Sequence, residues 1–250
     1  MISFLNIGSG SKGNATLIYN EDSLILVDMG LPRSSLKAAL DEINRPIEDI
    51  LGVLITHNHD DHIRNLKTLH NSYPIYAGKE AILDEHIGVN PTDSFSIGSF
   101  DIIPLRTSHD APDSFGYLFI SGDERLLYMT DTGRIPNEDL PYMKDCDYYI
   151  LESNYDVWML MHSKRPIYLK RRIKGDYGHL SNKDSALHMS SLIGEHTKKI
   201  YLAHLSEECN TAEKAKKTYK KIFKEKGVTF SIDNVVTLKQ HEMTFGGDEE

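Results

Sequence analysis

The segment Thr56–His62 constrains the fold and chemistry of this chain more than any other part of the sequence. It reads THNHDDH and follows the apolar run ILGVLI, which is typical of a buried strand. Three imidazoles and two carboxylates so close together are costly to bury for packing alone, and both groups are ligands of divalent metal ions. In an extended segment His57 and His59 point to the same side, while Asp61 and His62 aim at a neighbouring position. The spacing therefore predicts two adjacent metal ions.

Three further candidate ligands stand at the ends of other predicted strands. His109 follows the strand at 100–105, Asp131 closes the run YMTD, and His204 ends the run IYLAH. A metal site built from strands needs its ligands at strand ends. Their order along the chain after the HxHxDH motif favours ligand roles for all three.

The remaining pattern predicts an α/β fold. One helical face comprises Leu36, Ala39, Leu40 and Ile43. Two further helices are expected to begin at the capping pairs Ser181–Asp184 and Asn210–Glu213. Strands are expected at 2–7, 15–19, 23–28, 50–56, 74–77, 100–105, 117–121, 126–129, 148–151 and 199–203. Strands that alternate with helices predict a layered domain with both hairpin and crossover connections.

The charge is acidic on average but unevenly spread. The chain of 250 residues carries 28 Lys and Arg against 37 Asp and Glu, a net charge of −9. Residues 1–160 contribute 11 − 25 = −14, and residues 161–250 contribute 17 − 12 = +5. Residues 164–174 hold six bases and no acid, with Tyr168 and Tyr177 nearby. The average therefore does not exclude a nucleic-acid partner.

The sequence also predicts the setting of the protein. No apolar run approaches the length of a membrane span, no signal peptide is visible, and two cysteines make a disulfide framework implausible. We expect a cytoplasmic protein with no membrane partner. The oligomeric state is not readable from these patterns.

The N-terminal run GSGSKG matches the glycine pattern of dinucleotide-binding folds, with Asp28 about twenty residues further on. That fold requires a helix directly after the third glycine, whereas the next residues, ATLIY, are typical of a strand. We therefore expect no nucleotide cofactor. The run is expected to be a hairpin loop, or a loop that brings Lys12 and main-chain N–H groups close to a substrate phosphate.

Taken together, these motifs resemble those of the metallo-β-lactamase-fold hydrolases, and the resemblance covers nearly the whole chain. Within that superfamily the chain is most similar to the WalJ/YycJ-like group, which is related to the tRNase Z and β-CASP nucleases. The superfamily motifs are LVDMG at 26–30, THNHDDH at 56–62, His109, MTDTG at 129–133 and His204. The closer match rests on GSGSKGN, ESNYD at 152–156, GHLSN at 178–182 and AHLSEECN at 203–210.

The resemblance implies a four-layer αββα sandwich, formed by residues 1–250 as a single domain without an inserted β-CASP domain. Residues 245–250 are expected to form a flexible acidic tail. It implies two divalent ions, Zn or Mn, with Asp28 orienting the histidine loop and His179 beside the scissile phosphate. One ion would be held by His57, His59 and His109, and the other by Asp61, His62 and His204, with Asp131 bridging.

The favoured function is therefore a metal-dependent phosphodiesterase acting on nucleic acid, with a metal-bridging hydroxide as nucleophile. Family resemblance favours a 5'→3' exonuclease and DNA over RNA. Asp61 and His179 are the expected catalytic residues, and Lys12, Arg171, Arg172, Ser181 and Asn182 are the expected substrate contacts. Two alternatives stay open: a glyoxalase- or lactonase-like ester or thioester hydrolase, and a metal-bearing protein with a regulatory role.

Overall fold

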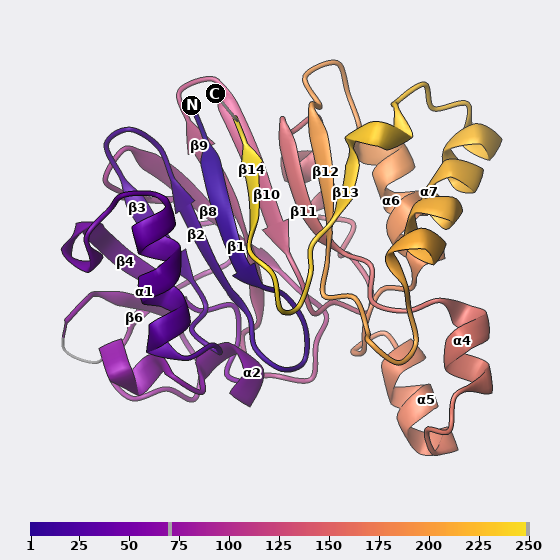
Figure 1. Ribbon diagram of the computed structural model, residues 1–250, viewed down its shortest axis with the longest axis horizontal. Coiled ribbons are helices and arrows are strands. Elements are labelled where there is room, and N and C mark those ends of the chain that lie inside the picture. The colour runs from indigo at the N-terminus through magenta and orange to yellow at the C-terminus, as the bar shows by residue number, and fades with distance from the viewer. Residues whose placement is uncertain (70–71, 249–250) are drawn as a thin grey trace. The chain divides into compact units, whose positions relative to one another are not determined.

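The apolar runs of the N-terminal half form strands separated by turns, as the sequence predicts. A computed structural model describes residues 1–69 and 72–248 of the chain (Figure 1). The chain divides into two compact units. Unit 1 comprises Met1–Leu105, Ala111–Arg125 and Lys239–Glu250, and unit 2 comprises Arg106–Asp110 and Leu126–Leu238.

Unit 1 contains a mixed sheet of seven strands. Neighbouring strands from β14 to β3 are antiparallel, and those from β3 to β6 are parallel. Short loops join β1 to β2 and β2 to β3, whereas helix α1 provides the crossover that the parallel pair β3 and β4 requires. In order, the strands are β14 (Thr244–Gly247), β1 (Ser3–Gly8), β2 (Ala15–Tyr19), β3 (Leu24–Val27), β4 (Ile50–Leu54), β5 (Ile75–Gly78) and β6 (Ile87–Val89).

The predicted helical face of unit 1 is confirmed by helix α1 (Arg33–Glu42), which buries Leu36, Ala39 and Leu40 against the sheet. The unit also contains the antiparallel pair β7 (Phe95–Ile97) and β8 (Phe100–Arg106), and strand β9 (Phe115–Ser121). Its short helical turns are η1 (Ile47–Asp49), α2 (Asp60–Ile63) and η2 (Leu66–Leu69).

Unit 2 is built on four parallel strands. They are β10 (Glu124–Met129), β11 (Tyr148–Glu152), β12 (Lys199–Ala203) and β13 (Val235–Thr237). Parallel strands present their carboxyl ends at one edge, so residues that follow β10, β11 and β12 meet there. Its helices are α3 (Leu140–Met143), α4 (Val157–His162), α5 (Ile167–Lys174), α6 (Asn182–Leu192), η3 (Ile232–Asn234) and α7 (Ala212–Lys226). Strands and helices alternate as predicted, and the α/β class is confirmed.

The starts of helices α6 and α7 test the two predicted capping pairs. The first is confirmed, because the Ser181 hydroxyl caps α6 and accepts the Asp184 N–H at 3.1 Å. The second is wrong by one residue, since Thr211 caps α7 and accepts the Lys214 N–H at 3.1 Å. The Asn210 side chain is instead buried and donates to main-chain carbonyls.

The prediction of a flexible tail over residues 245–250 is wrong for its first part. Strand β14 pairs with β1 in antiparallel register, with Gly247 opposite Ser3 and Phe245 opposite Leu5. The backbone of β14 therefore completes the edge of the sheet in unit 1. The last two residues of the predicted tail, 249 and 250, lie outside the described residues. Among residues 1–69 and 72–248, no helix is both long and apolar enough to cross a membrane.

Candidate metal centre

The histidine motif of unit 1 leaves the sheet at the end of β4. His57 and His62 are buried, and their ring centroids lie 4.0 Å apart. His59 has an extended backbone, with φ −69° and ψ 149°, and its ring centroid lies 4.6 Å from that of His57. The two-residue alternation expected from the sequence therefore holds. The short helix α2 then carries Asp61 and His62.

Asp28, which follows β3, is fully buried and hydrogen-bonds to two residues of the histidine motif. Its carboxylate accepts the Thr56 N–H at 2.9 Å and lies 2.7 Å from His62 Nδ1. The Asn14 side-chain amide lies 3.0 Å from Nε2 of the same imidazole. Because Nδ1 faces a carboxylate and Nε2 faces an amide donor, Nδ1 carries the proton of His62. The Nε2 lone pair accepts from Asn14 here and is the one that a metal ion would take in its place, in the tautomer that an outer carboxylate normally imposes on a ligand histidine.

The glycine-rich loop at residues 8–14 packs against the histidine motif. It joins β1 to β2 without an intervening helix, so the predicted hairpin loop is confirmed. The Asn14 N–H donates to the Asp61 carbonyl oxygen at 2.8 Å, and the Gly30 N–H donates to the Asn14 carbonyl oxygen at 2.9 Å. A Cβ atom at Gly30 would overlap that same Asp61 carbonyl. Lys12 is exposed, and its carbonyl oxygen accepts from Arg64 at 3.0 Å.

Unit 2 brings four potential ligands together at the carboxyl ends of its strands. One donor atom from each of Asp131, Glu152, His179 and His204 lies within 4.8 Å of the others. The Asp131 carboxylate is 3.3 Å from His204 Nδ1 and 3.4 Å from His179 Nδ1. Three of the four residues are buried, and His179 is partly exposed. An acidic group shared by two imidazoles in this setting suits a divalent ion.

Glu152 is a functional candidate that the sequence reasoning did not assign. Its Oε1 atom lies 2.8 Å from His179 Nδ1 and 2.9 Å from His204 Nδ1, while Oε2 accepts the N–H groups of Thr132 at 3.1 Å and Leu180 at 3.0 Å. Burial acts to raise the pKa of Glu152, but the charge of His179 and the hydrogen bonds from both histidines outweigh it and lower that pKa. The carboxylate is therefore ionised, and Nδ1 of each histidine is its donor.

His109 belongs to the same part of unit 2. Its Nδ1 atom donates to the Gly178 carbonyl oxygen at 3.1 Å, and its ring centroid lies 5.4 Å from that of His179. Burial, the largest effect, lowers the pKa of the His109 imidazole, against the opposing charge of Asp131. The neutral ring with a protonated Nδ1 presents its Nε2 lone pair, which is again the form that binds metal.

The expected substrate contacts of unit 2 fall into two groups. Ser181 and Asn182 are buried: Ser181 caps α6, and the Asn182 amide exchanges hydrogen bonds of 2.8 Å with Asn210. These bonds give both side chains a structural role, and their contact with phosphate stays a prediction. Arg171 and Arg172 lie on the exposed helix α5, where Arg172 pairs with Asp110 at 2.7 Å.

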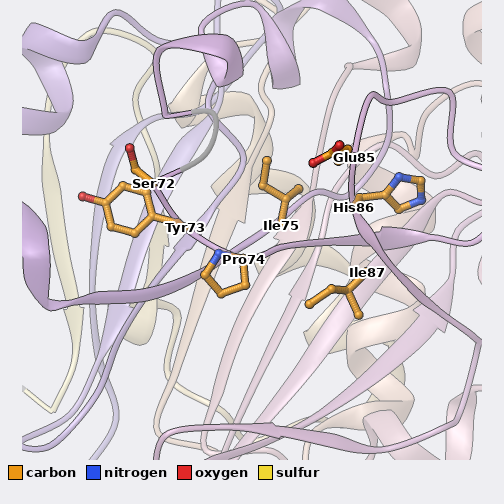
Figure 2. Close-up of a pocket in the computed structure, with 7 residues that line it drawn as sticks. All are labelled: Ser72, Tyr73, Pro74, Ile75, Glu85, His86 and Ile87. Carbon is orange, nitrogen blue, oxygen red and sulfur yellow. The ribbon is translucent and has the colours of Figure 1, made fainter.

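A pocket of about 480 Å³ in unit 1 contains none of the predicted site residues (Figure 2). Its one imidazole, His86, has Nε2 3.0 Å from the Gly78 carbonyl oxygen and Nδ1 3.2 Å from the Asp84 carbonyl oxygen. Main-chain oxygens thus face both ring nitrogens, and we assign the pocket no chemistry. It is lined by Ser72, Tyr73, Pro74, Ile75, Glu85, His86 and Ile87.

Comparison with known proteins identifies the family of this chain. The sequence profile of the beta-lactamase superfamily domain matches residues 25–205, which include Asp28 and end just beyond His204. The chain belongs to this superfamily. Its similarity to the WalJ/YycJ-like group is also confirmed: it is 35% identical over 237 residues to exodeoxyribonuclease YycJ of Bacillus anthracis, covering 90% of each chain. It is 36% identical over 229 residues to exodeoxyribonuclease WalJ of Streptococcus pneumoniae, covering 85% and 84%.

A solved structure supports the predicted metallo-β-lactamase fold. The metallo-β-lactamase fold protein YhfI of Bacillus subtilis superposes with a TM-score of 0.73 over 98% of this chain and 99% of its own, at 18% identity. The predicted fold is thereby confirmed. Besides Glu152, the sequence reasoning missed Asn14 and Thr56, whose side chains hydrogen-bond to the His62 imidazole, and Asn154, which donates to the His204 main-chain oxygen at 2.7 Å. Their signal is weak, because single polar residues at strand ends and in loops are common.

Proposed function

We propose that this chain is a metal-dependent phosphodiesterase that degrades DNA as a 5'→3' exonuclease. The observation that carries the proposal is the largely buried cluster of Asp131, Glu152, His179 and His204, whose ligand atoms lie within 4.8 Å of one another and in which Glu152 lies 2.8 Å from His179 Nδ1. The similarity to two named exodeoxyribonucleases over most of the chain supports the DNA substrate. The direction of degradation rests on family resemblance alone.

The chemistry of the donor atoms fits divalent metal ions. His62, His109 and His204 each direct Nδ1 at a buried oxygen, of Asp28, the Gly178 carbonyl and Glu152, respectively. This leaves Nε2 of each ring to bind metal. We propose that the chain binds two ions, Zn²⁺ or Mn²⁺, and that their ligands are His57, His59, Asp61, His62, His109, Asp131 and His204.

When bound, the ions supply Lewis-acid chemistry: they lower the pKa of a water molecule and neutralise charge on the phosphoryl oxygens. The residues of the chain orient the water molecule and the substrate and transfer protons. Asp61 accepts a hydrogen bond from the attacking water. The ionised Glu152 accepts the Nδ1–H of His179 and holds this imidazole in place, and His179 would donate a proton to a phosphate oxygen or to the leaving group.

The remaining site residues hold the substrate in this proposal. Lys12 is exposed on the loop that packs against the histidine motif, and Arg171 and Arg172 are exposed on α5. Each would contact phosphates and carry no sequence information. Ser181 and Asn182 would contribute indirectly, by fixing the start of α6 next to His179.

The test uses purified protein with Mn²⁺ or Zn²⁺ and DNA and RNA oligonucleotides labelled at either end. We expect stepwise shortening of DNA from the 5' end, abolished by His59→Ala. His179→Ala is expected to keep its metal and to lose about 100-fold or more of the rate, as for a general acid. His188→Ala, in α6, is the matched control. Normal cleavage by the His179 variant with metal bound would refute its role, and hydrolysis of esters or thioesters without cleavage of DNA would refute the proposed substrate.

A further inference from the structure

Helices α4 and α5 form a hairpin in unit 2, and α4 lies close to the first turn of α7 (Figure 1). Its inner face is apolar: Leu160 of α4 and Ile173 of α5 pack together with Tyr155 and Cys209. Lys170 joins the two helices by donating to two main-chain carbonyls at the end of α4, at 2.8 and 2.7 Å. The hairpin is therefore held by its inner face, and its outer face does not contribute to that core.

The outer face carries Trp158, the single tryptophan of the chain. This side chain is 62% exposed, although tryptophan is the largest apolar surface a residue can bury. Its ring stacks on His162, with centroids 4.3 Å apart and planes 22° apart, and His162 Nδ1 donates to the Trp158 carbonyl oxygen at 2.8 Å. The Lys214 ammonium lies 5.4 Å from the ring centroid. A flat, oriented aromatic pair with a cation beside it is thus presented to solvent.

Other large apolar side chains of the hairpin are exposed as well. Val157 and Met161, near Trp158 in the sequence of α4, are 41% and 43% exposed, and Ile167 and Tyr168 on α5 are each more than half exposed. Several large apolar side chains exposed on one hairpin are typical of a site of interaction.

The charge on the hairpin is positive. Residues 164–174 hold six bases and no acid. Arg165 pairs with Glu208 at 2.9 Å and Arg172 pairs with Asp110 at 2.7 Å. Three more bases are exposed and have no ion-pair partner among residues 1–69 and 72–248: Lys164, Arg171 and Lys174. Their charge is available for a polyanion.

We propose that the outer face of this hairpin binds single-stranded nucleic acid, with an unpaired base stacked on Trp158 and phosphates on Lys164, Arg171 and Lys174. The proposal rests on the proposed function and specifies the form of its substrate. Exposed aromatic rings beside unpaired cations fit a strand with free base faces. A duplex hides those faces in its own stack, and the positive charge disfavours a second copy of this basic surface.

Lys214 does not obstruct this mode of binding. Its side chain is 44% exposed, and its contact with Asp156, at 3.9 Å, is long for an ion pair. Stacking of a base on an aromatic ring is stronger than a cation–π contact exposed to water, so the base displaces the ammonium. The displaced lysine then meets the phosphate next to the stacked base, and the binding energy gains a charge contact.

Because Trp158 is the only tryptophan, its fluorescence reports directly on stacking. The metal-loaded protein is titrated with a single-stranded oligothymidylate of about twelve nucleotides that carries phosphorothioate linkages and resists hydrolysis. We expect quenching that saturates with the binding curve measured by anisotropy of the labelled oligonucleotide. A blunt duplex of the same sequence should bind without quenching. Binding of the single strand without any change in Trp158 fluorescence would overturn the proposal.

Variants separate stacking from charge. Trp158→Ala, at an exposed position, should weaken single-strand binding about 5- to 150-fold and leave duplex binding unchanged, and Trp158→Phe should restore part of it. Replacing Lys164, Arg171 and Lys174 together by Ala should reduce the salt slope of single-strand binding by about 2, and Lys220→Ala on α7 is the matched control with a smaller change. An equal loss for single strand and duplex in Trp158→Ala would contradict a stacking role.

Two further readouts keep this inference distinct from the proposed function. Hydrolysis of bis-p-nitrophenyl phosphate needs no strand binding, so Trp158→Ala should retain it. If the wild-type protein quenches with single strands but fails on this ester and on DNA, the phosphodiesterase proposal fails and the binding site stands. If sedimentation shows that Trp158→Ala turns a dimer into a monomer with unchanged affinity for single strands, the surface is a contact between copies and the proposal is wrong.

Discussion

Replacing Glu152 by glutamine tests the organisation of unit 2 at its centre. Four donors converge on this carboxylate: His179 Nδ1 at 2.8 Å, His204 Nδ1 at 2.9 Å, and the N–H groups of Leu180 at 3.0 Å and Thr132 at 3.1 Å. A carboxylate accepts with both oxygens, whereas the glutamine amide accepts with one oxygen and donates with its nitrogen. In Glu152→Gln, the amide nitrogen must therefore face one of the two pairs of donors.

The two pairs differ in how they can respond. Main-chain N–H groups cannot move their proton, so the glutamine oxygen is expected to stay with Thr132 and Leu180. The imidazoles of His179 and His204 then accept from the amide through Nδ1 and carry their proton on Nε2. Two charge-assisted hydrogen bonds become neutral ones, a loss of about 2–3 kcal/mol in the free energy of unfolding. The Nε2 proton blocks metal binding by His204, and we expect metal affinity to fall about 10- to 100-fold.

Three measurements check this reasoning. Urea unfolding of the metal-free protein gives the loss of stability, calorimetric titration with Mn²⁺ or Zn²⁺ gives the affinity, and ¹⁵N spectra of the imidazoles identify which nitrogen is protonated. Glu138→Gln is the control, because Glu138 is an exposed carboxylate of the same unit. The reasoning would be refuted by a Glu152→Gln protein with protonated Nδ1 atoms on both histidines and unchanged metal affinity.

Three other perturbations have definite expected outcomes. Asp28→Asn removes the charge that holds the His62 N–H, so metal affinity measured by calorimetry should fall about 10- to 100-fold while the far-ultraviolet spectrum stays unchanged. Gly30→Ala places a methyl group on a main-chain oxygen of the histidine motif and should lower the free energy of unfolding in urea by about 1–3 kcal/mol or more. Hydrogen bonding and charge from Asp145 raise the pKa of the exposed His196. The contact therefore stabilises the fold below the unfolded pKa of about 6.5, and this stabilisation is lost as the pH rises through the folded pKa. Asp145→Asn should return the pKa of His196, measured by NMR, to its ordinary range.

The sequence predicts the elements of this fold best where a pattern repeats along one surface. The helical face of α1 is such a case, because burial of that face selects one period. Strands β1 to β4 are buried along nearly their whole length, so the sequence reveals them as short apolar runs. Helices α4 and α5 are too short to repeat a pattern, and they expose many of their apolar residues, so periodicity gives no signal for them. Strand β14 is also not predicted from the sequence, because it is ordered by pairing with β1, at the other end of the chain.

The same reasoning explains which site residues the sequence reveals. His57, His59 and His62 stand out because three histidines share one short segment, whereas Glu152 is a single acid after an apolar strand and becomes informative only through contacts 27 and 52 residues away in the sequence. Ser181 is a position where one pattern favours two roles, a helix cap and a phosphate contact. The cap is confirmed, and the phosphate contact stays a prediction.

The backbone of the candidate site carries a cost that links fold to chemistry. Asp28, Asp131 and His204 each directly or closely follow a strand, β3, β10 and β12, and each has a positive φ, of 60°, 53° and 55°. This left-handed conformation costs a residue other than glycine about 1–2 kcal/mol. Glycine would remove the strain, but it has no side chain to offer. In a continuing strand, side chains alternate between the two faces of the sheet. A single residue in the left-handed conformation changes the direction of the backbone and turns its own side chain toward the edge of the sheet. The strain at these three positions is therefore best understood as the cost of placing a carboxylate or an imidazole at the edge of a sheet, and the buried hydrogen bonds of Asp28 and Glu152 help to offset it.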